Sequence, residues 1–335
     1  SICNALIPIT RGESMNSPAK KPDIDHHGED LPVLSKSAEK MKMDKLLTTP
    51  MPSFDGTVPG SYIWSNIAFW IARRILAVQF RTSEVTGVDT LPLDRGNLCC
   101  AWHTNGLIDP LQIVLKHPNN FVMGGRHVLV TRPLLGWWTR KLAVQPVVRK
   151  AELLRGGCSE EEATLLNGRS LMMLATGISA GFGCVLFPEG TSHNDSSMLR
   201  FRTGPFRTVF AAAAIAKANN QPIPAVIPLG LHFRRRDHFR TDVWVEYGAP
   251  LHIQEEDISP ELVNAVSQGN WVEPAAEHVF ALRDALRLEL VPMTPNTHDW
   301  DEYNALHLMG HVEARRTKHP SLTWRQEVEF SRAFR

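Results

Sequence analysis

The stretch LCCAWHTNGLIDP, residues 98–110, decides how this chain is interpreted. An apolar run ends at Trp102 and delivers His103 to the end of a predicted strand. A polar, glycine-containing turn follows, and Asp109 stands at the start of a predicted helix over 108–116. The pattern predicts an imidazole held against a carboxylate. A histidine at the edge of the core beside a helix-capping aspartate would give the same spacing, so that alternative stays open.

Charge and composition narrow the class of ligand. The chain has 335 residues, with 36 Lys and Arg against 35 Asp and Glu, for a net charge of +1. This balance argues against a general binder of polyanions, and no nucleic acid is expected as a partner. The charges are segregated, however, because basic residues dominate 193–240 and acidic residues dominate 255–302. This predicts a basic face suited to an anionic ligand or an anionic lipid surface.

The cysteines do not form a disulfide framework. They are odd in number and unevenly spaced, and three of them lie in apolar runs typical of a buried core. This usage predicts a reducing compartment. The five are Cys3, Cys99, Cys100, Cys158 and Cys184.

The chain divides into three predicted parts. Residues 1–58 are rich in Pro, Ser, Lys and Asp and are predicted to be a disordered tail. Residues 59–80 contain a Trp-rich helical stretch that is interrupted by Arg73 and Arg74 and is too short to span a bilayer. We expect an amphipathic helix on the membrane surface, with packing against the domain's own core as the alternative. Residues 81–335 are predicted to form one α/β domain.

Apolar runs alternate with helical patterns after residue 80, which predicts a twisted mixed sheet flanked by helices. Predicted strands are 80–88, 98–102, 121–123, 143–148, 184–187, 223–233 and 243–247, and predicted helices are 133–142, 150–180, 204–218, 275–290 and 300–315.

A second polar block, FPEGTS at 187–192, also follows a short apolar strand, as active-site loops in α/β sheets do. Gly190 permits close approach of the backbone, and Thr191 and Ser192 offer hydroxyl and N–H groups to an anion. A tight turn with a helix cap is the alternative. Arg149, Arg202 and Arg207 also follow predicted strands or this block, and a guanidinium can bind two phosphate oxygens at once, although surface arginines are common.

Several motifs are missing from the sequence. It contains no P-loop and no GxGxxG after a strand, and the lack of a GxSxG elbow disfavours a serine hydrolase. His103, Asp109, Glu189 and His193 offer metal-ligand chemistry, but their spacing matches no standard zinc pattern. We therefore predict no metal and no bound cofactor.

Together the blocks resemble the glycerolipid acyltransferase (PlsC-like) family. They run in the order His-x-Asn-x-x-x-Asp-Pro, an Arg after a Val-Gln-Pro-Val strand, Phe-Pro-Glu-Gly-Thr-Ser, and Val-Ile-Pro-Leu-Gly, within about residues 80–250. Five residues separate His103 from Asp109, where the common family pattern has four. This form resembles the glycerol-3-phosphate/dihydroxyacetone-phosphate acyltransferase branch. The later stretch over residues 294–301, which a predicted helix follows, resembles the same branch. Arg202 stands where many members carry Lys.

The resemblance implies a role for each matching residue. His103 would be the general base that takes a proton from a glycerol hydroxyl, and Asp109 would orient it. Arg149, Glu189, Gly190, Thr191, Ser192 and Arg202 would line the acyl-acceptor site, and Pro228 would shape the acyl-donor side. Acyl-CoA would be a co-substrate.

We therefore expect an acyltransferase that moves a fatty acyl group from acyl-CoA to glycerol 3-phosphate or dihydroxyacetone phosphate in glycerolipid synthesis. Membrane lipids are expected partners, with the protein at the endoplasmic reticulum facing the cytosol. Three alternatives remain open: a lysophosphatidate or other lysophospholipid acyltransferase, a non-catalytic lipid-binding protein of this fold, and a metal-dependent hydrolase using His103, Asp109 and His193.

Overall fold

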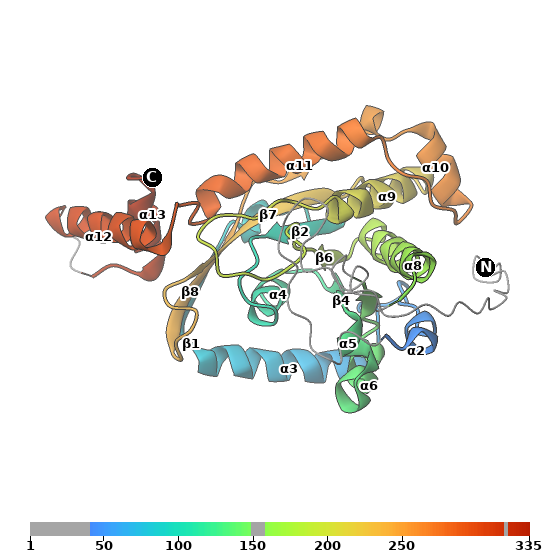
Figure 1. The fold of residues 1–335 in the computed structure, drawn as a ribbon, viewed down its shortest axis with the longest axis horizontal. Coiled ribbons are helices and arrows are strands. Elements are labelled where there is room, and N and C mark those ends of the chain that lie inside the picture. The colour runs from blue at the N-terminus through green and yellow to red at the C-terminus, as the bar shows by residue number, and fades with distance from the viewer. Residues whose placement is uncertain (1–40, 149–157, 318–320) are drawn as a thin grey trace, which may run out of the picture.

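The computed structural model describes residues 41–148, 158–317 and 321–335 (Figure 1). Its main sheet has seven strands, six in the order β1-β8-β7-β2-β6-β3 and the short β9 paired with β7. The strands are β1 (Phe80–Thr86), β2 (Asn97–Ala101), β3 (Phe121–Val122), β6 (Gly183–Val185), β7 (Ala225–Phe233), β8 (Thr241–Tyr247) and β9 (Leu251–His252). A second, two-stranded sheet pairs β4 (Gly124–Arg126) with β5 (Gln145–Val147).

The main sheet is mixed, as expected. β2 runs parallel to both β6 and β7, whereas β7 runs antiparallel to β8 and β9. Pro228 lies inside β7 at the junction of these two antiparallel partners, because β9 pairs with 225–226 and β8 with 229–233. The Pro228 carbonyl accepts from the Gly248 N–H at 2.8 Å.

Helices cover both faces of the main sheet (Figure 1). Helices α8, α9 and α11 lie on one side, and α3 and α4 lie on the other. Their bounds are α2 (Met43–Leu47), α3 (Tyr62–Gln79), α4 (Ile108–Val114), α5 (His127–Thr131), α6 (Pro133–Lys141), α8 (Glu160–Ser179), α9 (Gly204–Ala218), α10 (Pro260–Ser267), α11 (Ala276–Leu290), α12 (Trp300–Arg316) and α13 (Trp324–Arg332), with short 3-10 turns η1 (Val88–Thr90), η2 (Glu255–Asp257) and η3 (Val291–Met293).

Strand β2 divides two hydrophobic cores. Leu98 and Cys100 face the core under α8, α9 and α11, while Cys99 and Ala101 face the core beside α4. This alternation follows from the two-residue period of a strand. All four side chains are fully buried, so β2 is held rigidly from both faces. His103, two residues beyond the end of β2, is therefore placed by a strand that is buried on both faces.

The packed part of the chain begins before the domain boundary expected after residue 58. Residues 1–40 lie outside the described residues. Beyond them, α2 places Leu46 in a core with Val130 and Leu166, and Leu46 is fully buried. The side chain of Gln145 donates to the Pro50 carbonyl at 3.1 Å. The region from α2 onward is thus anchored to the body by both apolar burial and hydrogen bonds.

Helix α3 directs apolar side chains to solvent. Ile63, Ile67 and Trp70 share one helix face and are exposed, whereas Ser65 and Ala72 are the only buried residues of α3. Its neighbour α6 joins this surface through Trp137, whose ring centroid lies 4.9 Å from that of Trp64. Among the described residues no helix is long and apolar enough to cross a bilayer.

The C-terminal helices α12 and α13 pack together at one end of the sheet, against β8 (Figure 1). Trp324 is buried with Trp244 and Val328, and its indole N–H donates to the His232 carbonyl at 2.8 Å. Glu246 accepts hydrogen bonds from Arg332 of α13. Burial raises the pKa of Glu246, but its bonds to Arg332 and His232 outweigh burial and lower it to about 2.

We expect Trp324→Ala to lower the free energy of unfolding by about 3–5 kcal/mol, because it leaves a large cavity against β8 and an unpaired carbonyl. Urea unfolding followed by circular dichroism measures the loss. Leu308→Ala on α12 is the control, since that side chain is 64% exposed, and it should cost less than about 0.5 kcal/mol. Equal effects of the two changes would show that the α13 contact does not stabilise the fold.

Candidate active site

The predicted histidine and aspartate lie in contact at the carboxyl end of β2. His103 Nδ1 is 3.0 Å from Asp109 Oδ2. The Asp109 side chain is fully buried in the first turn of α4, and the His103 side chain is 12% exposed. A carboxylate at Nδ1 favours the tautomer that leaves the lone pair on Nε2, which is the arrangement a general base requires.

The loop between the two residues explains why five intervening residues do not separate them. The N–H groups of Thr104 and Asn105 both donate to Asp109 Oδ2 at 2.7 Å. The Asn105 side-chain oxygen accepts from the Ile108 N–H at 3.0 Å, which closes the turn at the start of α4. The loop thus wraps around the carboxylate, and the extra residue is taken up in the turn.

A second buried carboxylate, Glu189, connects this loop to the block after β6. Its Oε1 accepts the His103 N–H at 3.0 Å. Its Oε2 accepts the Leu199 N–H at 2.7 Å and lies 2.5 Å from His193 Nε2. Phe187 stacks on the His103 ring at a centroid distance of 3.7 Å. Glu189 therefore uses both oxygens to bind the protein's own groups.

The glycine-containing loops of the two blocks lie side by side. A Cβ added at Gly106 would come within 3.9 Å of Ser192 Oγ. Gly190 has a φ of +73°, so this position favours glycine. A Cβ there would lie 3.4 Å from Arg202 Cγ, and the Arg202 N–H donates to the Pro188 carbonyl at 2.7 Å. Gly190 and Arg202 are thus neighbours.

A surface hollow of about 410 Å³ opens beside the His103–Asp109 loop. It is lined by polar and charged side chains from three loops, which follow β2, β6 and β7. These residues are Thr104, Asn105, Ser192, His193, Asn194, Arg236 and Asp237. Because β7, β2 and β6 are adjacent and parallel, their carboxyl ends meet at one edge of the sheet.

The other predicted site residues are placed differently. Thr191 is half-buried in the loop after β6, next to Ser192. Pro228 is buried within β7, opposite Cys100, and does not line the hollow. Arg149 lies outside the described residues. The hypothesis that Arg207 serves this anion site is not supported, because its guanidinium pairs with Glu273 and stacks over Trp271.

Sequence reasoning missed two residues of this region, Arg236 and Trp300. Arg236 follows β7 as Glu189 follows β6, so its position after a central strand was the available signal. Trp300 begins α12, and its indole N–H donates to the Asn194 carbonyl at 2.7 Å. Its ring centroid lies 6.2 Å from that of Trp102. No local pattern indicates that this distant tryptophan packs beside the site.

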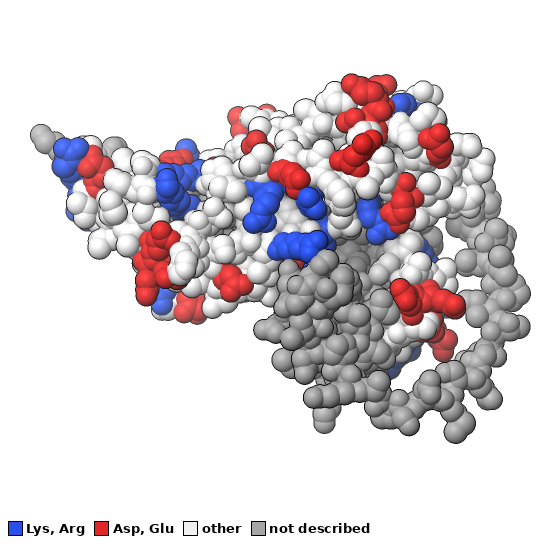
Figure 2. Space-filling view, turned by 45° about the horizontal axis from the view of Figure 1, so that its top comes forward, with Lys and Arg blue, Asp and Glu red and all other residues white. Residues whose placement is uncertain are grey.

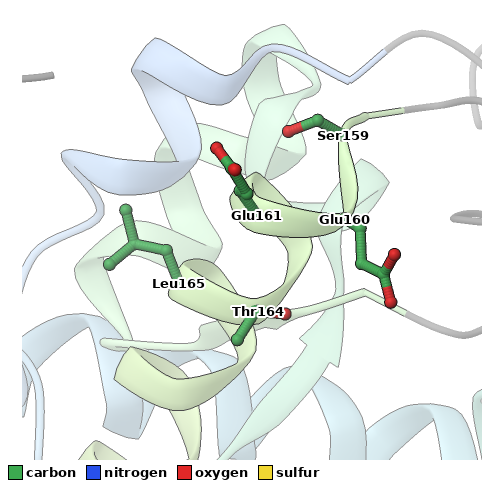
Figure 3. A pocket seen from close by; sticks show the side chains of 5 residues that line it. All are labelled: Ser159, Glu160, Glu161, Thr164 and Leu165. Carbon is green, nitrogen blue, oxygen red and sulfur yellow. The ribbon is translucent and has the colours of Figure 1, made fainter. Parts of the chain in front are cut away.

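A larger hollow, of about 720 Å³, lies at the start of α8 (Figure 3). Its side chains spread apart and do not converge on a common point. They are Ser159, Glu160, Glu161, Thr164 and Leu165, and Ser159 is occupied in capping the helix. The smaller hollow is therefore the one that lies beside the His103–Asp109 pair and has polar and charged side chains in its wall.

Charge on the surface is grouped, as the sequence predicted. Figure 2 shows a group of basic side chains near the middle of one face, with one acidic group directly beside it and further acidic groups toward the upper right. Within the described ranges, no three His, Cys, Asp or Glu side chains lie close enough together to hold a metal ion.

Comparison with known proteins agrees with the chemistry of the site. Residues 82–230 match the family model described as Acyltransferase. Glycerol-3-phosphate O-acyltransferase 2 of Saccharomyces cerevisiae is 31% identical over 120 residues, which cover 36% of this chain and only 14% of the yeast protein. The structure of PlsC, a 1-acyl-sn-glycerophosphate (LPA) acyltransferase from Thermotoga maritima, has a TM-score of 0.41 and 18% identity over 66% of this chain and 80% of that chain. A likeness this low does not identify a substrate.

We expect Glu189→Gln to destabilise the protein by about 1–3 kcal/mol, because an amide cannot accept all the hydrogen bonds that the two carboxylate oxygens now accept. Thermal and urea unfolding measure the change. Glu277→Gln is the matched control, since that side chain is 82% exposed, and it should have little effect. If Glu189→Gln were as stable as the control, the carboxylate would not hold these segments together.

Proposed function

We propose that this protein, whose residues 82–230 match the family model described as Acyltransferase, is an O-acyltransferase that uses acyl-CoA to acylate glycerol 3-phosphate or dihydroxyacetone phosphate. The observation that carries the proposal is the 3.0 Å contact between His103 Nδ1 and Asp109 Oδ2 beside a polar hollow. The contact also counts against the non-catalytic alternative, which a separated pair would have favoured.

The proposed reaction needs a base, its orienting carboxylate and a phosphate site. His103 Nε2 takes the proton as a hydroxyl oxygen of the acceptor attacks the thioester carbonyl carbon, forming the new C–O bond. Asp109 stabilises the imidazolium that results. The tetrahedral intermediate then releases the CoA sulfur as the C–S bond breaks, and the proton on His103 passes to that sulfur. Holding both substrates beside the base supplies much of the acceleration.

The acceptor's phosphate needs positive charge and N–H or hydroxyl donors. Thr191, Ser192 and Arg202 in and near the loop after β6 offer these, and Arg149 and Glu189 are assigned to the same site by the family resemblance. Glu189 would act there mainly by shaping the loop, since its oxygens accept from His103 and Leu199. Pro228 remains a predicted residue of the donor side.

Two features favour glycerol 3-phosphate over lysophosphatidate as the acceptor. One is the five-residue spacing between His103 and Asp109, which resembles that branch. The other is the yeast relative, whose name is a glycerol-3-phosphate acyltransferase, although the match covers a small part of it. A parallel assay with glycerol 3-phosphate, dihydroxyacetone phosphate and lysophosphatidate separates these acceptors.

We expect His103→Ala to lower acyl transfer by about 10²–10⁴-fold, since it removes the general base, while the protein still folds. Release of CoA thiol, measured with each of the three acceptors, reports the rate. His252→Ala is the control, because that side chain is exposed on β9, and it should keep wild-type turnover. A His103→Ala protein with wild-type turnover on every acceptor would refute the base assignment.

We also propose that the exposed apolar surface of α3 and α6 lies on a membrane. On α3 it consists of Ile63, Ile67 and Trp70, and Arg74 lies over the Trp70 ring at 5.6 Å. On α6, Leu134 is 87% exposed. Apolar side chains flanked by arginine suit the interface of an anionic leaflet, where the acylated product would also reside. Location at the endoplasmic reticulum facing the cytosol remains a prediction.

We expect the double change Ile63→Glu and Trp70→Glu to weaken binding to vesicles of phosphatidylcholine and phosphatidylserine by about tenfold or more. The change removes apolar area that would be buried in the membrane, and it adds negative charge. Vesicle flotation measures the bound fraction. Phe280→Glu with Leu288→Glu on α11 adds the same charge to exposed apolar positions on the other side of the sheet. Equal loss in both proteins would show that charge alone, not this surface, governs binding.

A further inference from the structure

Arg236 is a cation in the wall of the hollow with an unused donor. Its Nη1 atom is buried and has no hydrogen-bond partner among the described residues. Its guanidinium lies over the Trp300 ring, 5.5 Å from the centroid. A buried donor without a partner costs about 1–3 kcal/mol, so the arrangement favours a ligand that supplies an acceptor.

The charge of Arg236 persists in this setting. Burial lowers the pKa of the guanidinium from its ordinary value, and the carboxylates of Asp109 and Asp237 act in the opposite direction. Because arginine remains protonated in proteins, the side chain presents a positive charge to the hollow. Asp237 is 67% exposed and pairs with His238 at 3.0 Å. Arg236 is thus available to an incoming anion.

The surroundings favour a phosphate as that anion. Thr104, Asn105 and Ser192 add polar groups to the hollow. The backbone N–H groups of Thr104 and Asn105 hold Asp109, so the hollow lies directly beside the proposed base. In glycerol 3-phosphate only a few bonds separate the phosphate from the reacting hydroxyl, whereas the long pantetheine arm of CoA separates its phosphates from the thioester. The acceptor's phosphate is therefore the better match.

We propose that Arg236, held against Trp300, binds the phosphate of the acyl acceptor in this hollow. The inference rests on the proposed function. Trp300 fixes the guanidinium plane and also ties down the opposite loop through Asn194, so α12 contributes to acceptor binding. The competing role is electrostatic, since Asp109 Oδ1 also lacks a hydrogen-bond partner among the described residues and Arg236 could act on that carboxylate instead.

The test measures equilibrium binding of inorganic phosphate and of glycerol 3-phosphate by calorimetry, and the KM values for acceptor and acyl-CoA. We expect Arg236→Gln to weaken binding of both phosphates by about tenfold or more, because a charge-assisted hydrogen bond is lost. The acceptor KM should rise while the acyl-CoA KM stays constant. Arg236→Lys should restore binding in part, since it keeps the charge but not the planar fork.

Arg235→Gln is the matched control. Arg235 is adjacent in sequence and its side chain is 62% exposed, so the change removes the same charge outside the proposed site. It should change phosphate binding by less than about twofold. The proposal is overturned if Arg236→Gln binds phosphate as the control does, if the wild-type protein binds neither phosphate, or if the acyl-CoA KM rises instead. A change in kcat and its pH profile at constant acceptor binding would also overturn it, in favour of a role on Asp109.

The two proposals fail in different ways. If the wild-type protein acylates none of the three acceptors, the proposed function is wrong. Phosphate binding to the wild-type and Arg236→Gln proteins then still decides whether Arg236 forms an anion site.

Discussion

The buried carboxylate of Asp109 is the interaction on which the site depends. A charged group with no exposure is tolerated only when hydrogen bonds replace its water. Asp109 Oδ2 meets this requirement with two backbone N–H groups and the His103 ring. The loop after β2 must therefore close around the carboxylate. The same carboxylate oxygen orients the imidazole through its contact with Nδ1. The hydrogen bonds that let Asp109 be buried are thus the same ones that orient the His103 ring.

Glu189 repeats this principle on the neighbouring loop. It accepts backbone N–H groups at His103 and Leu199, which lie on separate segments, and it contacts His193. The two carboxylates join the ends of β2 and β6 into one polar layer on top of two apolar cores. Parallel strands place these ends at the same edge, so the sheet topology supplies proximity and the carboxylates supply orientation.

Much of this was predictable from residues close together in the sequence. The β2 stretch, the turn to Asp109, the α9 helix and the acyltransferase blocks all carry local signals, and the structure contains a mixed sheet flanked by helices. The predicted strand over 143–148 does exist, as β5, but it pairs with β4 in the small sheet and not in the main one. Pairing partners depend on distant residues, which periodicity does not report.

Long-range packing accounts for what the sequence could not indicate. Trp300 lies beside the site because α12 packs on α13, and α13 contacts β8 through side chains such as Trp324 that have no special local pattern. Arg236 stood among several basic residues after β7, and only its burial distinguishes it from Arg235. The exposure of the apolar side chains of α3 likewise follows from long-range packing, because the core covers only a small part of that helix.

The position of Arg236 and Trp300 has a consequence for how such a protein can diversify. The segment that matches the acyltransferase family ends at residue 230, and it contains His103, Asp109 and Glu189. Arg236, which lines the hollow, and Trp300, which lies under its guanidinium, are both beyond this segment, one in a loop and one on a C-terminal helix. The proposed catalytic pair and the proposed phosphate-binding arginine are therefore encoded in different stretches of the sequence. Substitutions in the later stretch could alter acceptor recognition without touching the proposed catalytic residues.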